Sequence, residues 1–224
     1  MVVLTSVVPG HDLGLAVILL TLIVKFILVP ISHKTIKTQK KLKELEPEIT
    51  KLKEKHKDDQ QGQALKIMEL YKEHGVNPFS GVFLMFIQLP IILGLFFVFR
   101  TGIDLNSTDI YSFIVKPAYL SPLFLGFIDL TKKNIYLSIL VGVTQFIQVQ
   151  MSLPPTLPKN KDKEPSFGDN LAQSMNFQMK FILPIFIMFI SYKLNTAVSL
   201  YWIVNNLFTI AHEYYVKIKA NKIL

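Results

Sequence analysis

The chain has 224 residues, of which 50% are hydrophobic and 18% are charged, with a formal net charge of +8 at pH 7. This composition is too apolar for an ordinary soluble domain and is typical of a small polytopic membrane protein. Because the sequence contains no cysteine, we expect neither disulfides nor thiolate chemistry. No basic region or small-residue cleavage site precedes the first apolar stretch, so we expect no cleavable signal peptide.

Five apolar segments approach the roughly 20 residues that a helix needs to cross a bilayer. We predict membrane spans at residues 13–32, 79–99, 135–153, 177–192 and 196–216. The fourth span reaches only roughly 24 Å at 1.5 Å per residue, and a hydrocarbon core is about 30 Å thick, so we expect the bilayer to thin there. The short connection before the fifth span predicts a tight hairpin.

The stretch of residues 33–78, after the first span, predicts a helical hairpin. Apolar residues recur at helical spacing on both sides of a polar turn at residues 58–62; they are Leu42, Leu45, Ile49 and Leu52, and then Leu65, Met68 and Tyr71. We expect Pro47 to begin a helical segment, because proline suits the first turn of a helix. Gly75 and Pro78 are expected to end the second helix and turn the chain into the second span.

The remaining connections have distinct compositions. In the outer loop, residues 100–134, an aromatic-rich stretch at 111–130 is interrupted by Lys116, Pro117 and Pro122. We interpret it as interfacial, with a sixth span as the competing interpretation. The proline-rich residues 154–176 predict a mobile loop. Residues 1–12 and 217–224 are expected to be short tails.

Lysine and arginine are unevenly distributed between the predicted connections. Residues 33–78, 154–176 and 217–224 together hold 17 of them, whereas the connections on the other side hold five. Because cytoplasmic loops carry the excess of positive charge, we predict an outer N-terminus and a cytoplasmic C-terminus. A sixth span would remove this bias.

Lys25 lies inside the first apolar stretch, with Thr21 one turn earlier on the same helix face. A charge at the centre of a membrane helix costs about 2.5–3.5 kcal/mol on insertion scales, so it usually faces a water-filled cavity or a partner. The alternative is snorkelling, because Lys25 lies roughly 10 Å from the cytoplasmic end of its span.

Other spans also carry polar residues. The fifth span carries Ser199, Trp202, Asn206, Thr209 and Glu213, which share one helix face. The third span carries Thr144, Gln145 and Gln148, and the second carries Gln88. A polar stripe on a membrane helix should not face lipid. Two interpretations stay open: the side chains line a hydrophilic groove, or they only form interhelical hydrogen bonds of about 0.6–2 kcal/mol each.

No motif predicts an enzyme. The five histidines lack metal-ligand spacing, no phosphate-binding loop or nucleophile elbow is present, and the spans contain no aspartate. We therefore expect no catalytic residue, metal, cofactor or covalent chemistry. The lysine-rich residues 33–78 also hold eight acidic residues, which favours a solvated helical face over DNA binding; docking to a ribosome or to anionic lipid is the alternative.

Four sequence blocks occur in one order along nearly the whole chain. They are LYKEHGVNPFSGVFLMFIQLPIILGLFFVFR from residue 70, FLGFIDLTKKNIYLSILVGVTQFIQ from residue 124, MNFQMKFILPIFIMFIS from residue 175 and SLYWIVNNLFTIAHEY from residue 199. In this order they resemble the YidC/Oxa/Alb family of membrane protein insertases. The resemblance implies an all-α fold of five membrane helices with a cytoplasmic helical hairpin. It also implies a hydrophilic groove that is open to the cytoplasm and lipid and closed outside.

The resemblance also implies roles for individual residues. The family has one basic residue, usually arginine, in the groove on the first span, and Lys25 matches that position but lacks the planar fork of arginine. Gln148 and Trp202 match a groove-lining glutamine and an aromatic residue. We expect Lys25 to contact the client protein, and we expect the groove to be lined by Thr21, Gln88, Thr144, Gln148, Ser199, Trp202, Asn206 and Thr209.

The function implied by the resemblance is insertion of client proteins into the plasma membrane of a bacterium. Nascent clients and the lipid bilayer would be the partners, with a ribosome and the Sec translocon as further candidates. Two alternatives belong to other classes. A scaffold holding ribosomes or membrane subunits would need residues 33–78 and not Lys25, whereas a small channel or transporter would need a second deep charge, which the spans lack.

Overall fold

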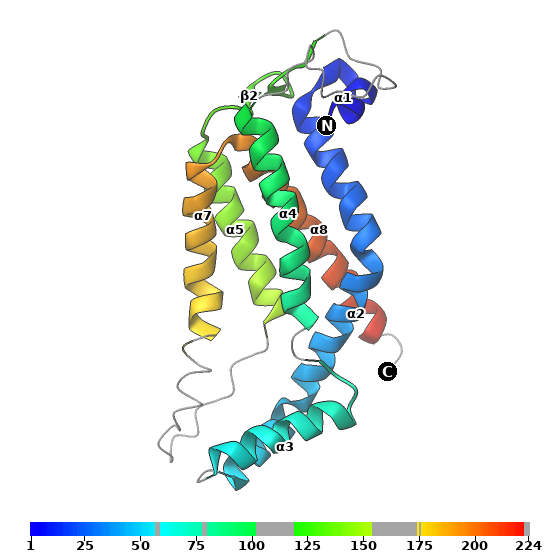
Figure 1. The fold of residues 1–224 in the computed structure, drawn as a ribbon, viewed down its shortest axis with the longest axis vertical. Coiled ribbons are helices and arrows are strands. Elements are labelled where there is room, and N and C mark those ends of the chain that lie inside the picture. Colours follow the sequence, from blue (N-terminus) through cyan, green and yellow to red (C-terminus); the bar gives the residue numbers. More distant parts are fainter. Residues whose placement is uncertain (57–58, 78–79, 102–118, 154–173, 175, 222–224) are drawn as a thin grey trace.

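The computed structural model describes residues 1–56, 59–77, 80–101, 119–153, 174 and 176–221, and these are mostly helical (Figure 1). In chain order the elements are α1 (Val2–Val7), the 3-10 helix η1 (Pro9–His11), α2 (Leu13–Lys55), α3 (Gln60–Glu73), α4 (Ser80–Thr101), β1 (Leu123–Phe124), β2 (Ile128–Asp129), α5 (Ile135–Ser152), the π-helical η2 (Gln178–Ile182), α7 (Leu183–Lys193) and α8 (Thr196–Asn221). Each predicted span therefore coincides with helical structure.

The start of the chain is folded onto α2. Residues 1–12, which we expected to be a tail, contain α1 and η1, and Thr5 is fully buried. Asp12 caps α2, because its Oδ1 accepts hydrogen bonds from the backbone N–H groups of Gly14 at 2.6 Å and Leu15 at 3.1 Å. Its Oδ2 accepts a further bond from the N–H of Leu125 at 2.7 Å, which ties the outer loop to the first turn of α2.

Helix α2 runs without a break through Pro30 and Pro47, so the prediction that Pro47 begins a helical segment is wrong. A proline inside a helix removes one backbone hydrogen bond. The helix continues past this loss, and Leu45, two residues before Pro47, is buried.

Helix α3 runs antiparallel to the distal part of α2, at one end of the molecule (Figure 1). The side-chain amide of Gln63 donates to the carbonyl of Lys53 at 3.0 Å, near the start of α3. Close to its other end, Tyr71 lies within electrostatic reach of Glu46. Asp59 caps α3 by accepting the N–H of Gly62 at 2.9 Å, so α3 begins inside the turn predicted at residues 58–62.

Residues 119–134 of the predicted outer loop are not helical. Strands β1 and β2 pair antiparallel, with Leu123 opposite Asp129. The carbonyl of Leu130 accepts the N–H of Ala197 at 3.2 Å, which joins this hairpin to the first turn of α8. A sixth helical span is therefore wrong over residues 119–130; Lys116 and Pro117 lie outside the described residues.

Helix α8 is central to the bundle and packs against α2, α4, α5 and α7 (Figure 1). Its first two turns contribute to two apolar clusters. One contains Ala197, Leu200 and Tyr201 with residues of α2, α4 and the outer loop, and the other contains Val198, Trp202 and Ile203 with Val141 of α5. Van der Waals packing of these side chains, together with interhelical hydrogen bonds, holds α8 in place.

Two of the described helices, α2 and α5, are long and apolar enough to cross a membrane. Both expose large apolar side chains, among them Phe26 and Ile27 on α2 and Ile139 and Val143 on α5. Extended apolar surface of this kind marks membrane or protein contact. The five-span topology stays a prediction, and most of the loop predicted at residues 154–176 lies outside the described residues.

Candidate functional site

Lys25 reaches from α2 to α8. Its Nζ donates a hydrogen bond to Oγ1 of Thr209 at 3.0 Å, and this hydroxyl donates in turn to the backbone carbonyl of Asn205 at 2.8 Å. The side chain of Lys25 is half-buried. The structure therefore holds an ammonium group at the interface of two apolar helices.

Helix α8 makes polar side-chain contacts with four other helices along its length. Ser199 bonds to Ser191 of α7 at 2.8 Å, Tyr201 bonds to Gln88 of α4, Asn206 donates to Thr144 of α5 at 3.2 Å, Thr209 accepts from Lys25 of α2, and Glu213 accepts from Ser152 of α5 at 2.7 Å. The stripe predicted on one face of α8 is therefore divided among several neighbours.

The predicted groove residues fall into two groups by exposure. Five are buried, namely Thr21, Thr144, Ser199, Trp202 and Asn206. Four are half-buried, namely Lys25, Gln88, Gln148 and Thr209. The hydroxyl of Thr21 donates to the carbonyl of Val17 in its own helix at 2.7 Å, and Trp202 lies in an apolar cluster with Val141 and Ile203.

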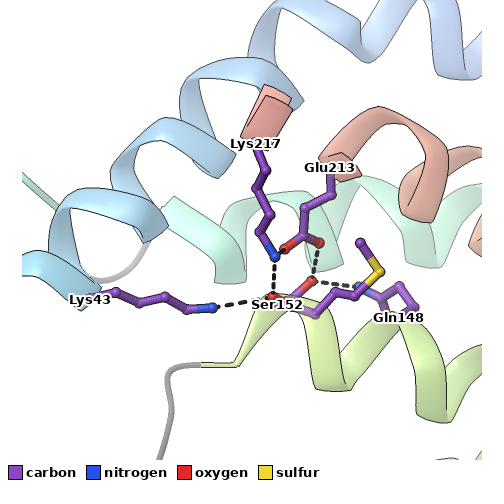
Figure 2. Close-up of polar contacts among 6 residues, drawn as sticks. Lys43, Gln148, Ser152, Glu213 and Lys217 are labelled. Carbon is purple, nitrogen blue, oxygen red and sulfur yellow. Dashed lines mark hydrogen bonds and ion pairs between the residues drawn. The ribbon is translucent and has the colours of Figure 1, made fainter. Parts of the chain in front are cut away.

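A second polar cluster joins α2, α5 and α8 (Figure 2). We call it the Ser152 cluster; it consists of Lys43, Gln148, Met151, Ser152, Glu213 and Lys217. Gln148 donates to Ser152 Oγ at 3.1 Å, Ser152 donates to Glu213, and Lys217 pairs with Glu213 at 2.9 Å. The ammonium groups of Lys43 and Lys217 both donate to the carbonyl of Met151, at 3.2 and 2.8 Å.

The Ser152 cluster concentrates charge at the C-terminal end of α5. The side chain of Glu213 is only 3% exposed, whereas that of Lys217 is 40% exposed. Burial and the nearby charge of Lys217 lower the pKa of Lys43, and Glu213 opposes this shift. The i, i+4 spacing of Glu213 and Lys217 could have revealed their pairing, but nothing local connects Lys43 to Met151.

The structure also brings together two histidines that the sequence left unassigned. The rings of His33 and His212 are stacked, with centroids 5.7 Å apart and planes inclined by 23°. Within the described residues, no three His, Cys, Asp or Glu side chains are placed to hold a metal ion.

An apolar helical bundle with polar contacts between its helices is the construction of an integral membrane protein. A sequence profile of the 60Kd inner membrane protein family matches residues 3–222. The chain belongs to this family.

The chain is similar in sequence to relatives named membrane protein insertase YidC, and it covers different shares of their lengths. That of Citrifermentans bemidjiense is 33% identical over 205 residues, which cover 91% of this chain and 33% of the relative. That of Francisella tularensis subsp. novicida is 32% identical over 203 residues, covering 90% of this chain and 32% of the relative. That of Fusobacterium nucleatum subsp. nucleatum is 31% identical over 210 residues, which cover 93% of this chain and 88% of the relative. The chain thus spans about a third of the first two and most of the third.

Proposed function

We propose that this chain is a membrane protein insertase, which receives polar segments of client proteins and releases their apolar segments into lipid. The observation that carries the proposal is the position of Lys25, whose ammonium group is held 3.0 Å from Thr209 between two apolar helices. Relatives that carry the name insertase support the same function.

The proposed topology has five spans, with the N-terminus outside and the C-terminus in the cytoplasm of a bacterium. The excess of lysine in residues 33–78 supports this orientation. The α2–α3 hairpin would then project into the cytoplasm, where its mixed lysine and glutamate surface could dock a ribosome or the Sec translocon. The residues of β1 and β2, together with the cap at Asp12, would close the outer end of the bundle.

In the proposed mechanism, water beside Lys25 lowers the cost of bringing a polar client segment into the membrane. The ammonium group attracts client carboxylates, since opposite charges interact more strongly where the dielectric constant is low. Burial of the client's apolar helix supplies the driving free energy, about 0.3–0.6 kcal/mol for each Leu or Ile on the insertion scale. No bond is made or broken.

We assign different tasks to the two groups of predicted groove residues. Lys25, Gln88, Gln148 and Thr209 are half-buried, and we propose that they contact water and client. The buried group (Thr21, Thr144, Ser199, Trp202 and Asn206) would instead hold the helices around α8 in position.

The test is insertion of a single-span client with an acidic tail into liposomes that contain the purified protein. We expect Lys25→Arg to insert the client and Lys25→Ala to fail, because Arg keeps the charge and Ala removes it. Lys37→Ala is the matched control, since Lys37 is an exposed lysine on the same helix. Equal insertion by wild type and Lys25→Ala would contradict the role of Lys25.

The same preparation separates the insertase from its alternatives. If folded wild-type protein inserts no client, the insertase proposal is wrong. Ion flux through these liposomes would then support a channel. Binding of ribosomes that depends on the α2–α3 hairpin would support a scaffold.

A further inference from the structure

His33 of α2 and His212 of α8 face each other across the interface that also holds Lys25. Both side chains are half-buried, and their rings stack at a centroid distance of 5.7 Å. Phe208 lies one turn before His212, and its ring meets that of His212 edge-on at 6.2 Å. The two imidazoles are therefore held against each other while each remains partly exposed.

The histidine pair lies between Lys25 and the end of the bundle that we propose to be cytoplasmic. On α2, His33 follows Lys25 by eight residues, or roughly 12 Å along the helix axis. On α8, His212 follows Thr209 by three residues, and Thr209 is the residue that binds the ammonium group of Lys25. A client segment that approaches Lys25 from the cytoplasm along this interface would pass the histidines first.

Few other charges face His212. The ionisable groups within electrostatic reach of His212 are His33 and Lys25 from α2 and Glu213 from its own helix. The carboxylate of Glu213 is already engaged by Ser152 and Lys217. The sequence of α5 contains no Asp, Glu, Lys, Arg or His, and that of α4 contains only Arg100, at its opposite end.

We propose that His33 and His212 form a proton-dependent receiving site for client carboxylates on the route to Lys25. The inference rests on the proposed insertase function and names clients with acidic translocated tails as those that use the site. Histidine changes charge in the physiological pH range. Two stacked imidazolium ions repel each other, and a carboxylate beside them stabilises the charged pair.

The experiment compares two single-span clients that differ only in whether the tail carries Asp or Asn. Insertion into liposomes is measured at pH about 6 and about 8, on either side of the ordinary histidine pKa. The protein carries Lys25→Arg, so that the charge at position 25 stays constant, and the wild type is run in parallel. The test variant is His33→Gln with His212→Gln, and the matched control is His56→Gln, at the far end of α2.

We expect the parent protein, which carries Lys25→Arg and both histidines, to insert the Asp-tailed client about two- to five-fold better at the lower pH. This gain is typical of one exposed ion pair. The double Gln variant should lose this difference, while His56→Gln should keep it. The Asn-tailed client should insert equally at both pH values. Thermal unfolding of each variant at both pH values shows whether it is folded, and His212→Gln alone replaces the double variant if that does not fold.

Two negative results have different meanings. If a folded Gln variant keeps the full pH dependence for the Asp-tailed client, or if the parent shows none, the histidine site is wrong and the insertase proposal stands. If neither client inserts at either pH with folded wild type, the proposed function itself is wrong.

Discussion

The Nζ of Lys25 lies 3.0 Å from Oγ1 of Thr209, although 184 residues separate them in the sequence. The same hydroxyl donates to the carbonyl of Asn205. Thr209 therefore uses its hydroxyl both to hold the ammonium group and to anchor itself to its own helix. We infer from this arrangement that Thr209 positions Lys25.

Replacement of Thr209 tests this positioning role. We expect Thr209→Val, which keeps the side-chain shape, to lower insertion of an acidic-tailed client about two- to five-fold, because loss of one hydrogen bond typically costs about 0.5–1 kcal/mol. Thr209→Ser keeps the hydroxyl and should remain close to wild type. Equal insertion by the Val and Ser variants would show that Thr209 does not position Lys25.

The Ser152 cluster predicts an order of stability between two variants. Glu213→Gln keeps an acceptor for Ser152 and leaves the half-exposed Lys217 hydrated, so we expect a loss of about 1–2 kcal/mol in the free energy of unfolding. Lys217→Met should cost more, about 2–4 kcal/mol, because the buried carboxylate of Glu213 loses its ion pair. Denaturant unfolding in detergent measures both, with the exposed Glu48→Gln as control. A larger loss for Glu213→Gln than for Lys217→Met would mean that Glu213 and Lys217 are not paired as in Figure 2.

Two glycines, Gly14 of α2 and Gly94 of α4, should respond oppositely to alanine. A Cβ at Gly14 would overlap the ring of Phe124, whereas nothing lies within 4 Å of a Cβ at Gly94. We expect Gly14→Ala to destabilise the protein by about 1–3 kcal/mol through overpacking. Gly94→Ala should be neutral or stabilise α4 by up to about 1 kcal/mol. Thermal unfolding in detergent distinguishes these outcomes, and similar effects of the two substitutions would argue against the contact between α2 and β1.

The outer loop should lose stability only in strong acid. Hydrogen bonds from Thr131 and from Lys132 lower the pKa of Asp129 from 3.8 to about 2. A carboxylate with a lowered pKa stabilises the folded loop fully above the unfolded pKa, and this contribution is lost as the pH falls from about 4 towards 2. Carboxyl NMR titration of Asp129 measures the pKa. Thr131→Val should return it towards 3.8, and a wild-type pKa near 3.8 would contradict the bonded geometry.

The sequence by itself located the long helices but not α1 and η1, because apolar length and periodicity are local properties. Each predicted span coincides with a described helix, and the pattern at Leu42–Leu52 and Leu65–Tyr71 predicted the two helical segments that lie antiparallel. Local rules failed where packing opposed them. The preference of proline for a first turn misplaced a helix start at Pro47, because an interior proline removes only one backbone hydrogen bond and α2 continues through it.

Only the tertiary structure decided which polar residues meet. Periodicity placed Ser199, Asn206 and Thr209 on one face of α8, but it could not show that they bond to α7, α5 and α2 respectively. The stacking of His33 on His212 joins helices at opposite ends of the chain. Such contacts depend on how the helices pack around α8, and this packing follows from van der Waals contacts and interhelical hydrogen bonds summed over the whole bundle rather than from any local pattern.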